Sequence, residues 1–332
     1  MKIFITGIAG FLGSHLADHF IAQGHKVVGV DNLLGGYLEN VPVQAEFHKT
    51  SCSNLEALQT IMHGVDVVYH CAATAYEGLS VFSPYLVTQN VSGITASVLS
   101  AAIVNKVKRF IYCSSMARYG EQAVPFYEDM GTRPQDPYGI AKVAGEDLVK
   151  NLCKVHGIEY VIAVPHNIIG PRQKYDDPYR NVASIMANRL LQGKQPIIYG
   201  DGEQKRCFSF ISDVVAPLAL MATAPVSGET INIGPDEEFV TINQLGSVLS
   251  DITGMPFEPI YMPGRPQEVK EATCSADKAR RLLNYQTKTS LVDGLKEIVA
   301  YIKERGPKPF TYHLPLEIVN DKTPATWKEK LM

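Results

Sequence analysis

Short apolar segments that alternate with helical periodicity limit what the first half of this chain can fold into. Runs rich in β-branched and aromatic residues occur at 2–6, 27–31, 65–70, 109–114 and 160–165. Stretches with helical periodicity separate them, at 14–23, 54–62, 89–104 and 138–156. Strands that are apolar on both faces and joined through helices belong to a parallel sheet that is covered on both sides. The pattern therefore predicts an α/β, Rossmann-type doubly wound parallel sheet.

The pattern loosens after about residue 170, where Pro, Gly and charged residues interrupt shorter segments. Helical periodicity returns near 182–192, 213–223, 242–252, 276–283 and 290–304. We predict a main domain over 1–170 and, over 171–306, a smaller lobe interleaved with a last strand or two of the main sheet. Residues 307–332 form a tail that contains the only tryptophan, Trp327, and gives no signal of function.

Composition and charge exclude several classes of protein. The 332 residues are 45% hydrophobic with a net charge of −3, so no strongly basic surface for nucleic acid or anionic membranes is expected. The cysteines lack metal-ligand spacing, and we predict that they are reduced and bind no metal: Cys52, Cys71, Cys113, Cys153, Cys207 and Cys274. No apolar run approaches the roughly 20 residues that cross a bilayer, and the N-terminal apolar segment leads into a glycine motif instead of a cleavage site. A cytoplasmic location is expected.

Three glycines lie between the first strand and the first helix, as Thr6-Gly7-Ile8-Ala9-Gly10-Phe11-Leu12-Gly13. A dinucleotide's pyrophosphate binds at this position, where the unpaired N–H groups of a helix N-terminus face the phosphates. Asp31 ends the second strand, 18 residues beyond Gly13, where a carboxylate accepts hydrogen bonds from the adenosine ribose and repels a 2′-phosphate. The sequence therefore favours NAD over NADP as the cofactor.

A candidate catalytic group follows in the sequence Tyr138-Gly-Ile-Ala-Lys142, which puts a phenol and an ammonium on one face of a helix. A phenol with a pKa near 10 is a poor base at neutral pH, and a nearby ammonium together with a positively charged nicotinamide ring would stabilise the phenolate. Ser115, after the strand that ends near 114, would hydrogen-bond the hydroxyl that reacts. We predict that Ser115, Tyr138 and Lys142 are catalytic.

The spacing Gly-x-x-Gly-x-x-Gly, followed by the serine and the Tyr-x-x-x-Lys motif, resembles the extended short-chain dehydrogenase/reductase family over residues 1 to about 305. The resemblance implies an NAD-dependent epimerase or dehydratase that acts on a nucleotide sugar. It implies further cofactor contacts at Phe11, Leu12, Asn32, Ser51, Cys52, Cys71, Ala72, Ala73, Asn90 and Pro165. Ser51-Cys52 departs from the family's usual Asp and aliphatic residue, which puts the usual carboxylate contact to adenine in doubt.

The same resemblance implies the residues that hold the sugar nucleotide. Asn167 would contact the diphosphate, Arg206 would give a phosphate a charge-assisted fork, and Arg265 with Glu268 would contact phosphate and ribose. Other substrate contacts are implied at Thr74, Asn181, Val182, Ile197 and Tyr199. Ala272 aligns with the position that sets the pocket size beside the sugar's C2 substituent, where a small residue would admit an N-acetyl group.

The residues after Ser115 discriminate between reactions of the family. Related 4,6-dehydratases have an Asp-Glu pair where this chain has Met116-Ala117, which argues against dehydration and weakens a decarboxylase reading. Arg118 replaces a residue that is usually aliphatic, with a surface or a substrate-facing role both open.

The function that fits best is a nucleotide-sugar 4-epimerase, with a UDP-hexose or UDP-N-acetylhexosamine passing through a transient 4-keto sugar. Alternatives are another enzyme with retained NAD, such as a UDP-uronate 4-epimerase, an atypical dehydratase or a decarboxylase, and a non-catalytic NAD-binding scaffold or sensor. The helices expected at 89–104 and 138–156 are apolar on more than one face, and resemblance suggests that they pair in a homodimer.

Overall fold

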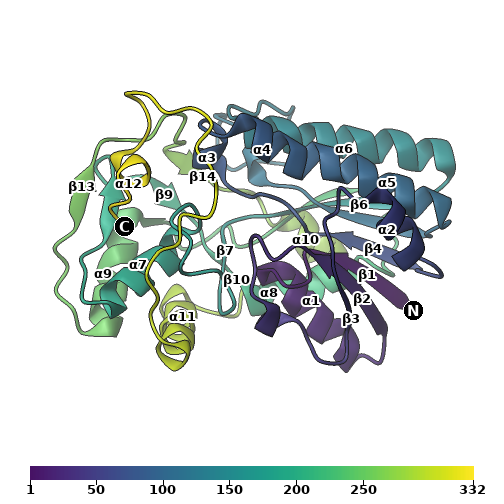
Figure 1. Ribbon diagram of the computed structural model, residues 1–332, viewed down its shortest axis with the longest axis horizontal. Helices are drawn as coiled ribbons and strands as arrows, with labels where there is room; N and C mark the ends of the chain where they lie inside the picture. The colour runs from purple at the N-terminus through teal and green to yellow at the C-terminus, as the bar shows by residue number, and fades with distance from the viewer.

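A computed structural model describes residues 1–332 and contains a seven-stranded parallel sheet in the order β11-β6-β5-β4-β1-β2-β3 (Figure 1). Its strands are β1 (Lys2–Thr6), β2 (Lys26–Asp31), β3 (Glu46–Lys49), β4 (Val67–His70), β5 (Arg109–Cys113), β6 (Glu159–Pro165) and β11 (Thr230–Ile233). The predicted doubly wound α/β fold is confirmed. Strand β3 was not expected from the sequence, because it lies at the sheet edge, is partly exposed and reads Glu-Phe-His-Lys without an apolar run.

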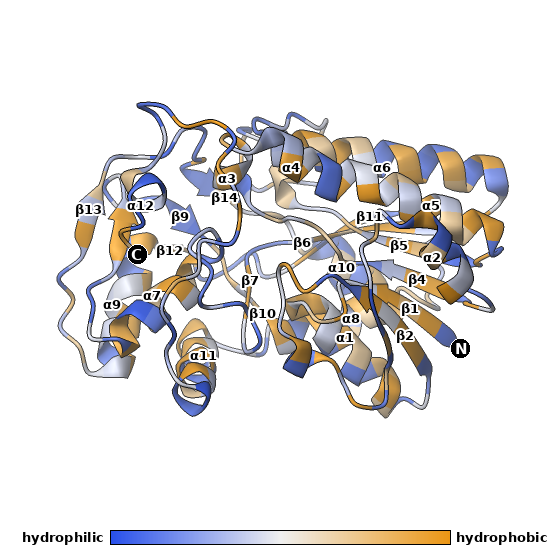
Figure 2. Ribbon diagram, viewed as in Figure 1, coloured by the Kyte–Doolittle hydropathy of each residue, from blue (hydrophilic) through white to orange (hydrophobic).

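Side chains along each central strand alternate between two hydrophobic cores, one on each face of the sheet. Ile3 and Ile5 of β1 belong to one core, and Phe4 between them belongs to the other. Strand β6 alternates in the same way, with Val161 and Ala163 on one side and Ile162 on the other. This two-sided burial explains why these strands are continuously apolar in the sequence (Figure 2).

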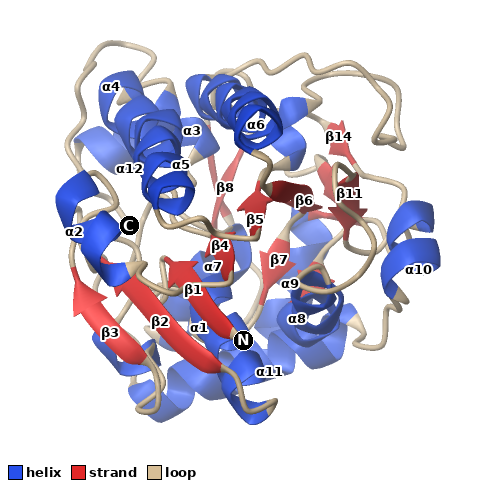
Figure 3. Ribbon diagram, turned by 90° about the vertical axis from the view of Figure 1, so that its right-hand side faces the viewer, coloured by secondary structure: helices blue, strands red, loops and turns tan.

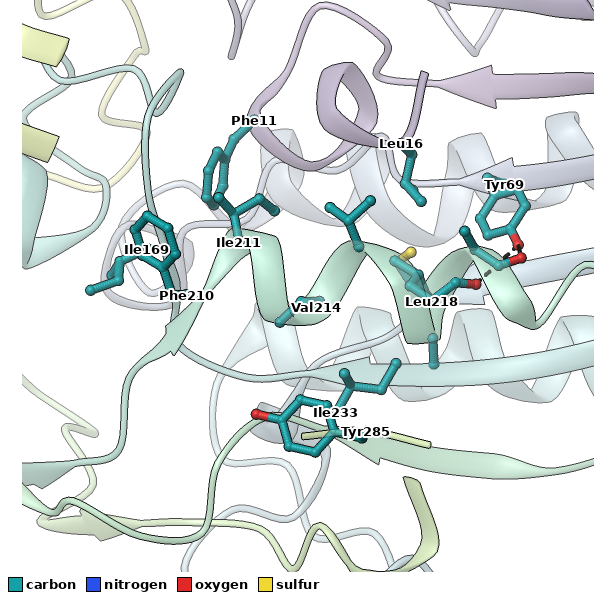
Figure 4. Packing of buried hydrophobic residues seen from close by; sticks show 14 of the residues in the cluster. Phe11, Leu16, Tyr69, Ile169, Phe210, Ile211, Val214, Leu218, Ile233 and Tyr285 are labelled. Atoms are coloured by element: carbon teal, nitrogen blue, oxygen red, sulfur yellow. Dashed lines mark hydrogen bonds between the residues drawn. The ribbon is translucent and has the colours of Figure 1, made fainter. Parts of the chain in front are cut away.

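Helices cover both faces of the sheet (Figure 3). One layer contains α2 (Leu55–Ile61), α5 (Ile94–Val104) and α6 (Pro137–His156). The other contains α1 (Phe11–Ala22) and α8 (Ile211–Leu220), which pack against each other. The Tyr69 hydroxyl of β4 donates to the carbonyls of Leu218 and Ala219 at 3.0 Å each, which fixes the end of α8 against the sheet (Figure 4).

The second lobe follows from β7 (Ile168–Ile169) and contains α7 (Val182–Leu191), α9 (Ile242–Thr253) and α11 (Leu291–Arg305), which pack together. Short strands complete it: β8 (Ile197–Tyr199), β9 (Lys205–Arg206), β10 (Ser209–Phe210), β12 (Val240–Thr241), β13 (Ile260–Met262) and β14 (Glu271–Ala272). Helix α10 (Asp277–Leu283) packs on β11 and α8. The short helices are α3 (Glu77–Ser80), α4 (Pro84–Thr88) and α12 (Ala325–Lys328).

One continuous helical stretch, Pro84–Val104, corrects the expectation that no apolar segment is long enough to cross a membrane. It consists of α4, a π-helical turn over Gln89–Gly93 and α5. By length and composition alone, its 21 residues are long and apolar enough to cross a membrane. In the structure 44% of its most apolar window is buried inside the protein, where it packs on α2 and α6. The helix also begins five residues earlier than predicted, because Pro84 is well suited to the first turn of a helix.

Candidate active site

The carboxyl ends of the parallel strands open into a cavity of about 500 Å³ between the main sheet and the second lobe. In a doubly wound sheet this edge is where ligands bind. All predicted catalytic, cofactor and substrate residues border this cavity, with the exception of Ala272. Residues from the first, middle and last thirds of the chain therefore meet at one site.

The glycine loop at one end of the cavity leaves no room for side chains. Gly7 has a φ of +72°, and a Cβ on Gly13 would lie 2.2 Å from the Gly7 carbonyl oxygen. Gly10 directly precedes α1, whose N-cap makes no side-chain hydrogen bond, so the first N–H groups of the helix are open to the cavity. This cradle fits a diphosphate at a helix N-terminus.

Asp31, at the end of β2, anchors the same loop. Its carboxylate accepts the Ala9 N–H at 3.0 Å and the Leu33 N–H at 2.7 Å, and it still borders the cavity. Burial is the largest effect on this group and raises its pKa, while the two backbone N–H groups act against it. The residues present fit the adenosine half of NAD, with Asn32, Ser51 and Cys52 beside Asp31 on the cavity wall.

Tyr138 and Lys142 lie on the first turns of α6, which begins abruptly at Pro137. The Asp136 carboxylate caps this helix by accepting the Gly139 N–H at 2.9 Å. One turn later, the Lys142 ammonium donates to the Cys113 carbonyl at 2.7 Å and lies 5.8 Å from the centre of the Tyr138 ring. Because β5 holds the ammonium, its position relative to the phenol is fixed.

Ser115 follows β5 in an extended conformation and caps a short 3-10 turn over Met116–Arg118. Its hydroxyl oxygen accepts the Ala117 N–H at 3.2 Å, so the hydroxyl proton is free to point into the cavity. The hydroxyl also stabilises the phenolate form of Tyr138. The structure thus brings together the three residues that were predicted to be catalytic.

Without a bound cofactor, the environment of Tyr138 favours the neutral phenol. Burial raises its pKa well above the usual value, the carboxylate of Glu77 raises it further, and Ser115 and Arg180 lower it. Burial also lowers the pKa of Lys142 to about 8, so the ammonium persists at neutral pH. The stabilisation of phenolate that was expected from Lys142 therefore needs a further positive charge in the cavity.

The far end of the cavity carries the residues that were predicted to hold the sugar nucleotide. Arg265 pairs with Glu268 at 2.9 Å and stacks over the Tyr199 ring at 4.6 Å. Arg206 donates to three backbone carbonyls, those of Val269 at 2.7 Å, Lys205 at 2.8 Å and Lys270 at 3.2 Å, so only its Nε and one Nη2 hydrogen remain for an anion. These two guanidinium groups form a cationic end opposite the glycine loop.

Comparisons with known proteins agree with this geometry. The family model described as the NAD dependent epimerase/dehydratase family matches residues 3–234. The chain belongs to this family. A UDP-glucose 4-epimerase structure from Thermotoga maritima is 35% identical, with a TM-score of 0.86, over 92% of this chain and 99% of that one. The UDP-glucuronic acid 4-epimerase of Bacillus cereus, solved with UDP-glucuronic acid and NAD, is 31% identical, with a TM-score of 0.86, over 92% of this chain and 100% of that one. A UDP-N-acetyl-alpha-D-glucosaminuronate decarboxylase from Bacillus cytotoxicus is 32% identical over 91% of this chain and 98% of its own length.

Membership of the NAD-dependent epimerase/dehydratase family confirms the resemblance and the NAD cofactor that were inferred from the motifs. Two residues that were predicted to bind the sugar nucleotide, Asn167 and Asn181, already form hydrogen bonds within the protein. The Asn167 amide donates to the Cys207 carbonyl at 3.0 Å, in a left-handed conformation with φ of 44°. Asn181 caps α7 by accepting the Ala183 N–H at 2.9 Å. Each amide can contact a substrate through its remaining hydrogen-bonding capacity only.

Ala272 is the one predicted pocket residue that the structure removes from the site. It lies on β14, where it pairs in parallel with Arg206 of β9, and its side chain is buried in the hydrophobic core under α6. The expectation that Ala272 sets the room beside the sugar is therefore wrong. A strand two residues long turned its side chain away from the cavity, and local sequence carries no sign of that.

Arg118 is neither on the surface nor in contact with the cavity. Its guanidinium is buried and holds Glu146 of α6 through two hydrogen bonds, at 2.8 and 3.1 Å. The Ser114 hydroxyl donates to the same carboxylate at 2.5 Å, and Lys150 approaches it at 3.2 Å. The pair joins the loop that carries Ser115 to the helix that carries Tyr138.

Besides Asp136, sequence reasoning missed two charged residues of the cavity wall, Glu77 and Arg180. Glu77 begins α3, and Ser80 on the same helix bonds to Asp136 at the start of α6, so α3 lies beside Tyr138. Arg180 stacks over the Tyr76 ring at 5.0 Å. Neither residue belongs to a periodic segment or to a motif that was used, and only their tertiary position marks them as candidates.

We expect the variant Glu77→Gln to move the acidic limb of the pH–activity profile to lower pH. Much of the Glu77 side chain is exposed at the cavity wall, and partial desolvation there, together with the nearby Asp136 charge, raises its pKa to about 7. When it ionises, its charge raises the pKa of Tyr138, so removing the charge makes the phenolate accessible at lower pH. Profiles of kcat/KM against pH test this. Glu77→Asp keeps the charge and should resemble the wild type, and a Gln variant with an unmoved or raised acidic limb would contradict the expectation.

Proposed function

We propose that the chain is an NAD-dependent nucleotide-sugar 4-epimerase, with UDP-hexoses or UDP-N-acetylhexosamines as the main candidates. The observation that carries the proposal is the position of Ser115, Tyr138 and Lys142 in one cavity, between the glycine loop and the arginine pair. Met116 and Ala117 supply no carboxylate where a dehydratase needs an acid and a base.

The residues divide the work of the reaction between them. Tyr138 takes the proton of the sugar's C4 hydroxyl and returns it to the same oxygen when the carbonyl is reduced again, while Ser115 donates a hydrogen bond to that oxygen. Lys142 holds a positive charge one turn from the phenol. NAD, when bound between the glycine loop and Tyr138, would supply a reversible hydride acceptor for C4, so the overall reaction would need no other oxidant or reductant. Arg206 and Arg265 hold the diphosphate while the 4-keto sugar turns over, and return of the hydride to the opposite face inverts C4.

A second candidate function, a UDP-uronate 4-epimerase, is favoured by Arg180. This guanidinium borders the cavity close enough to Tyr138 to lower the pKa of the phenol. Its buried Nε has no hydrogen-bond partner and lies 3.9 Å from the Asp177 carboxylate, its ion-pair partner. A cation at the sugar end would suit a substrate that carries a carboxylate. The absence of a carboxylate at positions 116 and 117 weighs against the dehydratase and decarboxylase alternatives, and the complete Ser-Tyr-Lys group weighs against a scaffold or sensor.

The deciding experiment incubates the purified protein with UDP-, GDP-, CDP- and dTDP-sugars, without added reductant, and follows the products by mass spectrometry and NMR. We expect a product of unchanged mass with inverted C4, formed from UDP-glucose, UDP-N-acetylglucosamine or UDP-glucuronic acid. A product that has lost water or carbon dioxide would replace the proposal with a dehydratase or a decarboxylase. Binding of NAD without any turnover would favour a sensor.

We further propose that the protein is a cytoplasmic homodimer that pairs through the α5–α6 layer. Apolar side chains remain exposed there, with Ile140 at 55% and Val104 at 61% exposure. All six cysteines are free, as expected in a reducing compartment. Light scattering should give twice the chain mass, and Ile140→Glu should shift the protein to monomer. A wild-type protein that is monomeric at micromolar concentration would contradict the dimer.

A further inference from the structure

The tail over residues 307–332 runs past α3 and ends at α12 beside β9 and β13 (Figure 1), and its last residue, Met332, borders the cavity. Two solved relatives are matched over 99% and 100% of their own lengths, but they match only 92% of this chain. The unmatched part of this chain is about as long as the tail. The resemblance to the family also ends near residue 305. The contacts of the tail indicate what it does in this chain.

The tail is fixed to the α3–α4 segment by backbone and side-chain hydrogen bonds. The Glu317 carboxylate accepts the N–H groups of Tyr85 and Leu86 at 2.9 and 2.8 Å, at the start of α4. The Phe82 carbonyl accepts N–H groups of Glu317 and Ile318 at 2.9 Å each. The Ser83 hydroxyl donates to a tail carbonyl at 2.7 Å. Such a set of bonds holds one defined conformation.

Trp327 anchors the end of the tail in a small hydrophobic core of its own. Its indole N–H donates to the Pro178 carbonyl at 3.2 Å, and its ring lies 5.4 Å from Tyr179 and 6.1 Å from Phe82. Tyr76 belongs to the same core, and Arg180 stacks over Tyr76. The tail therefore packs behind the residues that hold Arg180 in the cavity wall.

A second line of contact leads from the tail to Arg265. The Thr326 side chain is hydrogen-bonded to the Tyr199 hydroxyl, and Arg265 stacks over the Tyr199 ring. A Cβ placed on Gly78 would lie 3.3 Å from Trp327 and 3.6 Å from the Arg265 guanidinium, so α3, the tail and Arg265 meet at one point. Met332 itself borders the cavity.

We propose that residues 307–332 are a substrate-positioning element, which holds Arg265 and Arg180 from behind and completes the sugar-nucleotide end of the cavity. The proposal rests on the proposed function, because it assigns the tail to the same nucleotide-sugar site. No hydrogen bond joins the tail directly to the glycine loop, so NAD binding should be independent of Trp327 and Thr326. Trp327 and Thr326 act through Tyr76 and Tyr199, and neither needs to touch the substrate.

The test compares Trp327→Ala and Thr326→Val with Lys328→Ala, a control on the exposed face of α12. Calorimetric titration with UDP and UDP-glucose should show Kd values raised on the order of tenfold in the first two variants, the scale of one hydrogen bond to a charged group. The bound NAD content should stay at the wild-type level in all three variants. Wild-type Kd values in Trp327→Ala and Thr326→Val would overturn the proposal.

A truncated chain that ends at Lys308 gives a readout that does not depend on turnover. Hydrogen–deuterium exchange should become faster at 74–86, 176–180 and 197–201 and stay unchanged at the glycine loop. If the truncated and full-length chains exchanged at equal rates in all four segments, the proposed role of the tail would be overturned. A wild type that binds UDP-glucose without converting it would overturn only the proposed epimerase reaction, and a wild type that binds no nucleotide sugar would overturn both.

Discussion

Tyr138→Phe is expected to lower kcat by about 10² to 10⁴, the usual contribution of a positioned general acid–base group. The substitution removes only the hydroxyl that exchanges a proton with the sugar. The ring keeps its packing against Val87, Val91 and Ala141, so the fold should be unchanged. Initial rates with the sugar identified by the product panel, measured at constant NAD content, provide the test.

Tyr69→Phe is the matched control, because it also removes the hydroxyl of a buried tyrosine. Tyr69 lies on the opposite face of the sheet and loses two hydrogen bonds to α8, at a cost of about 1 to 3 kcal/mol in the free energy of unfolding. Its kcat should remain near the wild-type value. If Tyr138→Phe kept wild-type turnover while binding NAD normally, another group would have to carry the proton, and Glu77, whose charge acts on Tyr138, is one candidate.

Arg118→Leu is expected to lower the free energy of unfolding by about 3 kcal/mol, at the low end of the range for removing one partner of a buried ion pair. Only 4% of the Arg118 side chain and none of Glu146 is exposed, so the substitution leaves a buried carboxylate without its main partner. Lys150 and Ser114 remain beside it and limit the loss. Because the pair joins the Ser115 loop to α6, kcat should fall as well.

The double variant Arg118→Leu/Glu146→Gln tests whether the loss of stability comes from the unpaired Glu146 charge or from the lost packing of the Arg118 side chain. Removal of the stranded charge should recover a large part of the lost stability, and a double variant no more stable than the single one would show that the ion pair is not the cause. Arg109→Leu is the control for the effect on activity. Arg109 pairs with Glu159 and donates to two carbonyls far from the cavity, so its loss should reduce stability without changing kcat.

Much of the fold and the centre of the site could be predicted because their signals are local. A strand that is apolar on both faces, a glycine loop before a helix, and a phenol four residues before an ammonium each depend on backbone periodicity over a few residues. These patterns predicted the parallel sheet and brought Gly7, Asp31, Ser115, Tyr138 and Lys142 to one cavity. Edge strand β3 was not predicted because a partly exposed edge strand can form without the run of apolar residues that marks a buried strand.

The remaining features depend on packing between segments that are distant in the sequence. Arg118 pairs with Glu146 on a helix that begins beyond an intervening loop, and the tail bonds to α4 and to the turn before it across more than 200 residues of chain. Ala272 faces a core because β14 pairs with β9, and Glu77 and Arg180 reach the cavity from segments about 100 residues apart in the sequence. Short-range sequence encodes backbone period and turn geometry. Which side chains face one another across the protein is decided only when the elements pack, because that pairing is a property of the assembled core and not of any one segment.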